Sequence, residues 1–331
     1  MNPPLVEIQN LKVHFPVRSW RTFFGISPSV VRAVDGVTFS IYPQEILALV
    51  GESGCGKTTI GKTVLHLIKP TSGSVCLHGK DMVHLQGKTL RDIRRKIQLI
   101  FQDPYESLDP RQSVFDIVAE PLIIHKLFKS REDLEIKVYA ALEAAGLYPP
   151  KEISRRYPHL LSGGQRQRVA IASTLVLEPE FIVADEPVSM LDVSIRAEII
   201  RLMLDLRDKK NLTYLFITHD LSLAWIIADR IIVLYLGKIM EMGSASALIG
   251  SPKHPYTQAL VSVIPSPQPV HEQKPIILKG ETPSPANIPT GCRFHPRCWN
   301  YQKLGLPDIC VNQEPDLRFI DQEQFAACHF S

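Results

Sequence analysis

Residues 46–59 read ILALVGESGCGKTT, an apolar run that passes into a glycine-rich loop, and a helical pattern continues from residue 58. Glycines allow backbone N–H groups to converge on phosphate oxygens, and the positive end of the helix dipole adds to the attraction. Strand, loop and helix in this order around G-x-x-x-x-G-K-T predict a phosphate-binding loop for a nucleotide. The other interpretation, a plain glycine-rich turn, leaves the flanking strand and helix unexplained.

The residues of this loop have distinct expected roles. Lys57 is expected to reach the β- and γ-phosphates, and the hydroxyl of Thr58 to ligate Mg²⁺. Backbone N–H groups and small side chains supply the remaining contacts. The candidate nucleotide-binding residues of the loop are Gly51, Ser53, Gly54, Cys55, Gly56, Lys57, Thr58 and Thr59.

Two acidic residues follow a second apolar run, FIVAD at 181–185. A phosphate-loop ATPase needs a carboxylate on a neighbouring strand for the metal shell, and Asp185 is placed to supply it. Glu186 comes next and is positioned to orient or deprotonate the attacking water. A strand that ends in two acidic residues is common in proteins. This pair therefore indicates an ATPase site only in combination with the phosphate-binding loop.

The order of elements along the chain indicates an α/β fold. An antiparallel pair opens the sequence, strands then alternate with helices, and a helical subdomain is inserted at about 103–175. A proline-rich linker begins near residue 262, so we expect a nucleotide-binding domain over 1–261 and a small cysteine-containing extension over 262–331. The expected strands are 5–14, 37–42, 46–50, 74–78, 97–101, 181–185 and 213–218, and the expected helices start at 57 or span 194–208 and 221–228.

Composition limits the function classes. Lys and Arg number 37 against 34 Asp and Glu, and a net charge of +3 gives no reason to expect nucleic-acid binding. Apolar runs such as EILALVG and RIIVLYLG have the length of buried parallel strands, and no run reaches the 18 residues of a membrane helix. Because the start shows no export signal, we expect a soluble chain that acts at a membrane only through partners.

A third motif, LSGGQ at 161–165, resembles the signature sequence of the ABC ATPases, and it lies shortly before the Asp185 strand as in that family. Ser162 and two glycines at a helix N-terminus form a second anion site. In the family, the signature of one subunit caps the phosphate loop of the other, so the resemblance implies that hydrolysis is a property of a dimer. The implied contacts to nucleotide are Ser162, Gly163, Gly164 and Gln165.

Further elements of the same family occur in order. Gln102 resembles the loop glutamine that touches Mg²⁺ and water, and His219 resembles the switch histidine at the γ-phosphate. Phe15 aligns with the aromatic residue that stacks on adenine, although it is also a plausible core residue. The loop at 189–192 resembles the one that crosses the dimer interface, with Met190 where a small residue is more usual. The aromatic loop residues Trp20, Phe23 and Phe24 are left without a role.

The segments FQDPYESLDPR and GCRFHPRC are similar to ATPase subunits of oligopeptide and dipeptide importers, and the likeness is greatest to the second ATPase of the pair. This resemblance implies a homologous ATPase partner, two transmembrane permeases and an extracytoplasmic binding protein, with the chain at the cytoplasmic face of the membrane. Nickel and glutathione systems carry the same extension, so the cargo stays open. Two other classes remain: a soluble ABC ATPase of translation or DNA repair, and a metal-binding module with a regulatory ATPase.

Four cysteines, Cys292, Cys298, Cys310 and Cys328, fall within the last 40 residues. In a reducing compartment such a group favours metal ligation over disulfides. The intervals of 5, 11 and 17 residues are longer than the paired spacing of structural zinc sites. Four thiolates are the ligands of a [4Fe–4S] cluster, and tails of this kind in the peptide-importer ATPases can hold one. We therefore expect a structural [4Fe–4S] cluster, with zinc and free thiols as the alternatives.

Overall fold

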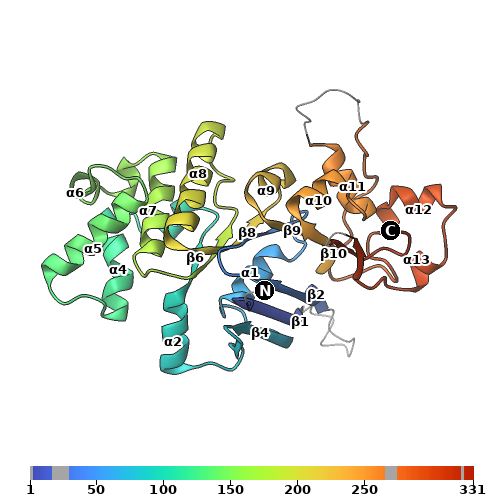
Figure 1. The fold of residues 1–331 in the computed structure, drawn as a ribbon, viewed down its shortest axis with the longest axis horizontal. Coiled ribbons are helices and arrows are strands. Elements are labelled where there is room, and N and C mark those ends of the chain that lie inside the picture. The colour runs from blue at the N-terminus through green and yellow to red at the C-terminus, as the bar shows by residue number, and fades with distance from the viewer. Residues whose placement is uncertain (1–2, 17–29, 265–273, 322–323) are drawn as a thin grey trace, which may run out of the picture. The chain divides into compact units, whose positions relative to one another are not determined.

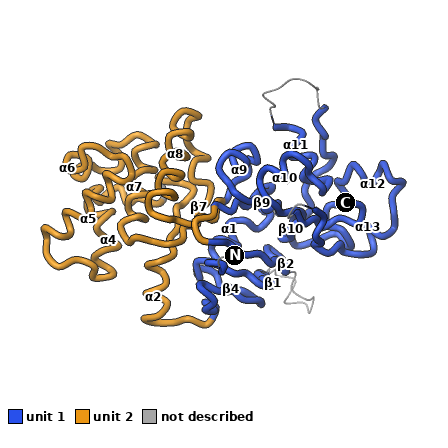
Figure 2. Tube along the Cα trace, viewed as in Figure 1, with its two compact units in different colours: residues 1–42, 46–83, 217–331 blue, residues 43–45, 84–216 orange. Residues whose placement is uncertain are grey.

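The computed structural model describes residues 3–16, 30–264, 274–321 and 324–331. They form two compact units, drawn in blue and orange in Figure 2. Unit 1 comprises residues 1–42, 46–83 and 217–331, and unit 2 comprises residues 43–45 and 84–216. Trp20, Phe23 and Phe24 lie outside the described residues. Among the residues described, no helix is both long and apolar enough to cross a membrane.

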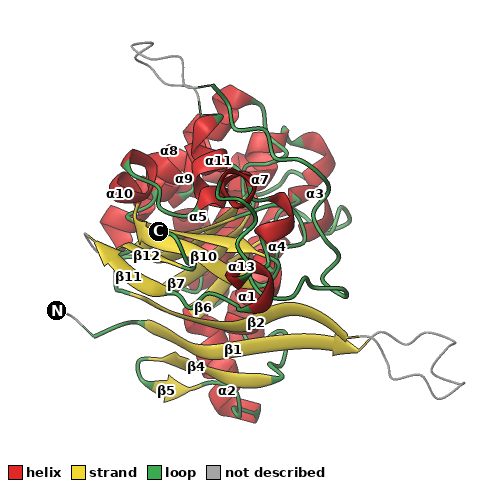
Figure 3. Ribbon diagram, turned by 90° about the vertical axis from the view of Figure 1, so that its right-hand side faces the viewer, coloured by secondary structure: helices red, strands yellow, loops and turns green. Residues whose placement is uncertain are grey.

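The first sheet of unit 1 is antiparallel and has the order β2-β1-β4-β5 (Figure 3). The expected opening pair is confirmed, because Val6 pairs with Ile41 and the pairing continues to Pro16 opposite Val30. The second strand begins earlier than the expected residue 37. Its early part alternates between exposed and half-buried residues, a weak signal in the sequence. The strands are β1 (Val6–Pro16), β2 (Val30–Ile41), β4 (Ser72–Leu77) and β5 (Lys80–Asp81).

The second sheet of unit 1 contains the strand before the phosphate loop. This strand, β3, is buried throughout and pairs in parallel with β9, as the two apolar runs predicted. The C-terminal residues add β12 and β11 to the far side of β10, with Ala326 opposite Glu241. The tail is therefore part of this sheet. The strands are β3 (Ile46–Val50), β9 (Arg230–Tyr235), β10 (Lys238–Ser244), β11 (Arg318–Asp321) and β12 (Gln324–Ala326).

The extension also shares the core of unit 1. Phe294 is fully buried, and its ring centroid lies 5.4 Å from that of Tyr235 and 5.2 Å from that of Tyr256. This sharing explains how a tail with little periodic apolar sequence is held in place. The helices of unit 1 are α1 (Lys57–Val64), α9 (Leu221–Ile227), α10 (Ala245–Gly250), α11 (Pro255–Ser262), α12 (Trp299–Lys303) and α13 (Ile309–Asn312), with a 3₁₀ turn at His295–Arg297 (Figure 1).

Unit 2 places helices around two parallel strands, β6 (Ile97–Ile100) and β7 (Phe181–Asp185). The helical stretch expected between these strands is present. A third strand, β8 (Thr213–Thr218), starts in unit 2 and ends in unit 1. The helices are α2 (Gly87–Lys96), α3 (Pro104–Ser107), α4 (Val114–His125), α5 (Arg131–Ala144), α6 (Pro150–Ile153), α7 (Gly163–Leu175) and α8 (Val193–Lys210).

Candidate nucleotide-binding site

The phosphate loop joins β3 to α1 in unit 1, and two of its glycines are required by neighbouring backbone. A Cβ on Gly51 would lie 2.3 Å from the carbonyl oxygen of Leu234, and a Cβ on Gly56 would lie 2.2 Å from that of Ala33. No larger residue fits at either position without moving the backbone. Gly56 also has a φ of 109° and serves as the N-cap of α1 without a side-chain cap. Gly56 has no side chain that could accept from the first N–H groups of α1, and this helix start is therefore open to a phosphate.

Lys57 is buried within the loop that it follows. Its Nζ lies 2.7 Å from the carbonyl oxygen of Gly51 and 3.1 Å from that of Glu52. These two acceptors hold the ammonium group at the centre of the loop, where a phosphate ligand would meet a fixed positive charge. The loop tip, Ser53 and Gly54, is exposed to solvent. Thr58 and Thr59 are half-buried in the first turn of α1.

Cys55 contributes to the loop through its backbone. Its N–H donates to the Glu52 carbonyl, and its own carbonyl accepts from the N–H of Gly237 at 2.9 Å. Burial raises the pKa of the Cys55 thiol, so the side chain behaves as a small apolar group. A part in nucleotide binding would therefore come from its position in the backbone turn.

The predicted adenine and switch residues also belong to unit 1. Phe15 stands near the end of β1 with 40% of its surface exposed, so it is not a core residue. His219 follows β8 and is exposed. The next residue, Asp220, caps α9 by accepting hydrogen bonds from the N–H groups of Ser222 and Leu223.

Unit 2 brings together two of the three predicted catalytic residues. The Nε2 of Gln102 donates to Oε2 of Glu186 at 3.1 Å. Glu186 has a φ of 47°, an unusual conformation for a residue with a Cβ, and its carbonyl accepts hydrogen bonds from Ser189. Asp185, the last residue of β7, is buried. The arrangement holds one carboxylate inward and directs the next toward an amide that can orient it.

The signature residues begin α7, and their local role was missed in the sequence. Ser162 is the N-cap, where its Oγ accepts from the N–H of Gln165 at 3.3 Å and its own N–H donates to Oε1 of Gln165 at 3.1 Å. The S-x-x-Q spacing of a capping box could have revealed this pair. Gly164 has a second reason to be small, because a Cβ there would lie 2.6 Å from Cγ2 of Ile195.

The four clustered cysteines are free thiols around one small cavity of unit 1. Burial, together with the nearby thiols of Cys298, Cys328 and Cys310, raises the pKa of Cys292 to about 12. The N–H of Cys292 donates to the carbonyl of Cys310 at 2.9 Å, which ties two of the four segments together. No group of side chains suited to a metal ion is found among the described residues. The structure thus gathers the thiols without demonstrating a metal centre.

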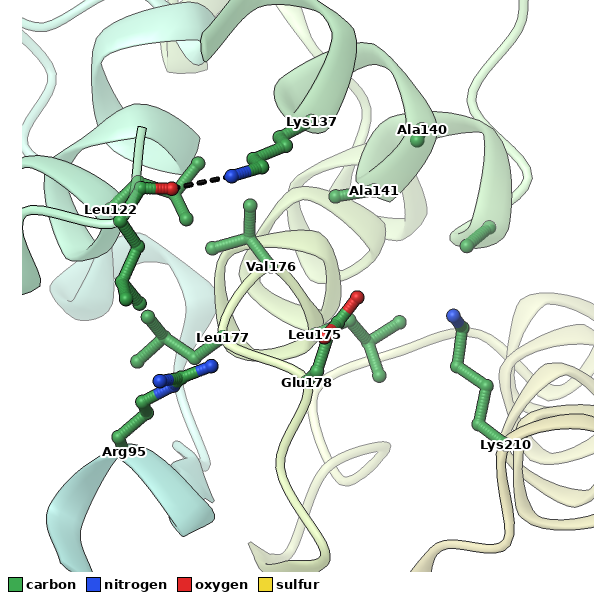
Figure 4. Close-up of a pocket in the computed structure, with 12 residues that line it drawn as sticks. Arg95, Leu122, Lys137, Ala140, Ala141, Leu175, Val176, Leu177, Glu178 and Lys210 are labelled. Carbon is green, nitrogen blue, oxygen red and sulfur yellow. Dashed lines mark hydrogen bonds between the residues drawn. The ribbon is translucent and has the colours of Figure 1, made fainter. Parts of the chain in front are cut away.

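A larger cavity, of about 190 Å³, lies among the helices of unit 2 (Figure 4). Its wall combines aliphatic side chains with Arg95, Lys137, Glu178 and Lys210, and Lys137 donates to the carbonyl of Leu127. None of the predicted site residues lines it. This cavity is therefore separate from the candidate nucleotide site.

Solved structures share the fold. The ATP-binding cassette MJ0796, a dimer in a post-hydrolysis state bound to ADP and Pi, matches with a TM-score of 0.64 and 29% identity over 72% of this chain and 98% of its own. CbiO1 from Clostridium perfringens, part of the transporter complex cbiONQ, matches in fold with a TM-score of 0.64 and 24% identity over 76% of this chain and 92% of its own. The class is therefore that of the ATP-binding cassettes.

Sequence comparisons identify the family within the ATP-binding cassettes. The family model "ABC transporter" matches residues 34–189, and the model "Oligopeptide/dipeptide transporter, C-terminal region" matches residues 240–303. AppF, an oligopeptide transport ATP-binding protein of Bacillus subtilis, is 47% identical over 98% of this chain and 97% of its own length. DppF, a dipeptide transport ATP-binding protein of Haemophilus influenzae, is 43% identical over 99% of this chain and 97% of its own length.

The chain belongs to the ABC transporter ATP-binding proteins, in the group with the oligopeptide/dipeptide-type C-terminal region. The expected fold class, an α/β ABC ATPase core, is confirmed. The expectation of an ATPase subunit that powers a transporter is confirmed as well.

Proposed function

We propose that this chain is one of the two ATPase subunits of a peptide importer. The observation that carries the proposal is the identity of 43–48% with oligopeptide and dipeptide transport ATP-binding proteins over nearly the full length of both chains. The chain would act at the cytoplasmic face of a membrane, bound to two permeases. An extracytoplasmic binding protein would deliver the cargo to those permeases.

The nucleotide site follows from the residues already described. Lys57, the backbone of the loop and the start of α1 would hold the phosphates, Phe15 would stack on adenine, and Glu186 would activate water. Mg²⁺, when bound, would neutralise developing charge on the phosphates, and the donors suited to it are Thr58, Gln102 and Asp185. Their hydroxyl, amide and carboxylate oxygens are ligands of the kind that this ion prefers.

The active unit is proposed to be a dimer. The N-terminus of α7 is rigidified by its capping box and offers backbone donors next to two glycines. It would close over the phosphate loop of a partner ATPase. MJ0796, the similar cassette, is dimeric in its ADP and Pi complex, which supports this arrangement.

Transport in proteoliposomes tests the cargo. The chain is combined with its partner ATPase, both permeases and the binding protein, and uptake of labelled di- and oligopeptides is compared with uptake of nickel and glutathione. ATP-dependent accumulation of peptides supports the proposal. Accumulation of nickel or glutathione alone, or ATPase activity that no permease stimulates, contradicts it.

We also propose that Cys292, Cys298, Cys310 and Cys328 hold a [4Fe–4S] cluster with a structural role. The fit is chemical, because four free thiols from four separate segments line one cavity. Bound iron would cross-link the segments of the tail.

Anaerobic purification tests this assignment. Iron and sulfide in a 4:4 ratio with visible absorption support the cluster, and replacement of all four cysteines by serine should abolish both signals and lower the melting temperature. Stoichiometric zinc in a colourless protein, or a tail that remains folded after the replacement, contradicts it. Replacement of Cys76, which is not among the four, serves as the control.

A further inference from the structure

Glu52, the second residue of the phosphate loop, is held by the C-terminal part of the chain. Both oxygens of its carboxylate lie close to Nη1 of Arg297, at 3.0 and 2.8 Å. The hydroxyl of Thr282 donates to the same carboxylate and also accepts from Nη1 of Arg297 at 2.9 Å. The backbone N–H of Glu52 donates to the hydroxyl of Tyr256 at 3.2 Å. Three distant segments thus converge on one loop residue.

Arg297 is itself fixed by the core of unit 1. Its side chain is only 10% exposed, and its guanidinium lies 5.9 Å from the ring centroid of Tyr235. It ends the 3₁₀ turn that begins one residue after the buried Phe294. The next residue is Cys298, one of the four clustered cysteines. The position of the guanidinium therefore depends on how the cysteine segment is packed.

The contact reaches the phosphate-binding groups through the backbone of Glu52. The carbonyl of Glu52 accepts from Nζ of Lys57 at 3.1 Å and from the N–H of Cys55 at 3.3 Å. A displacement of Glu52 would therefore shift both the lysine and the turn that present donors to phosphate. The charge matters as well, because an unneutralised carboxylate beside this loop would repel a polyanionic nucleotide.

We propose that Arg297 is a positioning residue for ATP binding, which holds and neutralises Glu52 and so links the cysteine-bearing tail to the phosphate loop. This inference rests on the proposed nucleotide site. It gives the C-terminal extension a direct effect on nucleotide affinity in addition to any role in anchoring. The state of the four cysteines, of which Cys298 directly follows Arg297 in the chain, would therefore affect the phosphate loop.

Nucleotide affinity of the full chain tests the proposal. Arg297→Met keeps the length of the side chain and removes its charge, and it should weaken binding of a fluorescent ATP analogue about tenfold, within the range usual for coupling between sites. In hydrolysis assays with the partner ATPase, KM should rise while kcat at saturation stays near wild type. Arg297→Lys, which retains a cation and one donor, should recover part of the affinity.

The most specific test combines Arg297→Met with Glu52→Gln in one double variant. Glu52→Gln removes the repelling charge, so Arg297→Met should cost much less in that background than in the wild type. Equal costs in the two backgrounds, or wild-type affinity in a folded Arg297→Met protein, would overturn the proposal.

A matched control separates positioning from general loosening of the tail. Lys253 also holds the C-terminal part of unit 1, through an ion pair of 3.0 Å with Asp321 and a hydrogen bond to Ser251, and within the described part of the chain these side-chain partners lie outside the phosphate loop. Lys253→Met should leave nucleotide affinity unchanged, and an equal loss in this variant would refute the specific role of Arg297. If Lys57→Ala binds nucleotide normally, the proposed nucleotide site itself is wrong. If Arg297→Met binds nucleotide with wild-type affinity while Lys57→Ala binds it weakly, only the positioning role of Arg297 is refuted.

Discussion

The amide of Gln102 donates a hydrogen bond of 3.1 Å to the carboxylate of Glu186, although the two residues are 84 positions apart. Glu186 follows the buried end of β7 and has a left-handed backbone conformation. The amide therefore orients a carboxylate whose backbone is already constrained. Such an arrangement suits a base that must face one particular water molecule.

Glu186→Gln should retain ATP binding and lose hydrolysis by a factor of about 10²–10⁴, the usual contribution of a general base. The amide keeps the size of the side chain but lacks the basic oxygen, so the variant should accumulate as an ATP-bound dimer. ATPase rate and ATP-dependent association in light scattering are measured together. Glu198→Gln, at an exposed acid of the same unit, is the control, and wild-type turnover in Glu186→Gln would exclude the assigned role.

Lys57→Ala should weaken nucleotide binding at least tenfold, because the fixed cation inside the phosphate loop is lost. Equilibrium titration with a fluorescent nucleotide measures the change. Lys62→Ala provides the control, since Lys62 lies in the last turn of α1. Equal affinity of the Lys57 variant and the wild type would show that this loop does not bind the phosphates.

Hydrolysis by the chain alone should rise more steeply than linearly with protein concentration, and addition of the partner ATPase should increase it. The reason is that, in the proposed dimer, the signature of one subunit would complete the nucleotide site of the other. The specific rate is recorded across a dilution series alongside the molar mass from light scattering. A fast, strictly proportional rate from a monomer would contradict a composite site.

Gly164→Ala should destabilise the protein by about 1–3 kcal/mol, the usual cost of overpacking, because its Cβ would lie 2.6 Å from Cγ2 of Ile195. Gly163→Ala is the matched control, since its nearest neighbour, Cδ2 of Leu191, is 3.6 Å away. Thermal and urea unfolding of both variants give the comparison. Ile195→Ala removes Cγ2, so it should cost less stability in the Gly164→Ala background than in the wild type. Equal stability of the Gly163→Ala and Gly164→Ala variants would refute the steric explanation.

Asp35→Asn should lower the free energy of unfolding by about 1–3 kcal/mol, because it removes one of the two ionic partners of the buried Arg293 and leaves only Glu314. Burial alone would raise the pKa of Asp35, but the hydrogen bond and charge of Arg293, together with His14 and Lys238, bring it below its usual value. Asp208→Asn, at an exposed ion pair with Arg207, should have little effect.

Asp35 should also make the stability of the protein depend on pH. Because the pKa of Asp35 is lower in the folded state, its stabilisation is complete above the unfolded value of about 3.9 and is lost as the pH falls through the folded value. The difference in melting temperature between wild type and Asp35→Asn should therefore narrow below about pH 4. A constant difference from pH 6 to pH 3 would contradict this origin.

Most of the strands and helices that were predicted correctly have local signals in the sequence. The strand before the phosphate loop, the strand before Glu186 and the helix at 193–210 were expected within a few residues of their bounds, since apolar run length and turn residues are local signals. The early start of β2 and the strands added by the tail were not predicted. Their residues alternate weakly and form strands because partner strands are available.

The sequence by itself determined the nature of the site, since the spacing of glycines, lysine and carboxylates reports local backbone geometry and charge. Only the tertiary structure showed that the carbonyl of Ala33 requires a glycine at position 56 and that Ile195 requires one at position 164. It alone showed that Arg297 binds Glu52, which lies 245 positions away in the chain. Such contacts depend on which distant segments pack together, and that packing leaves no fixed spacing along the chain. Accordingly, the four cysteines of the tail could be recognised as candidate ligands from the sequence, whereas the contact between the tail and the phosphate loop was seen only in the fold.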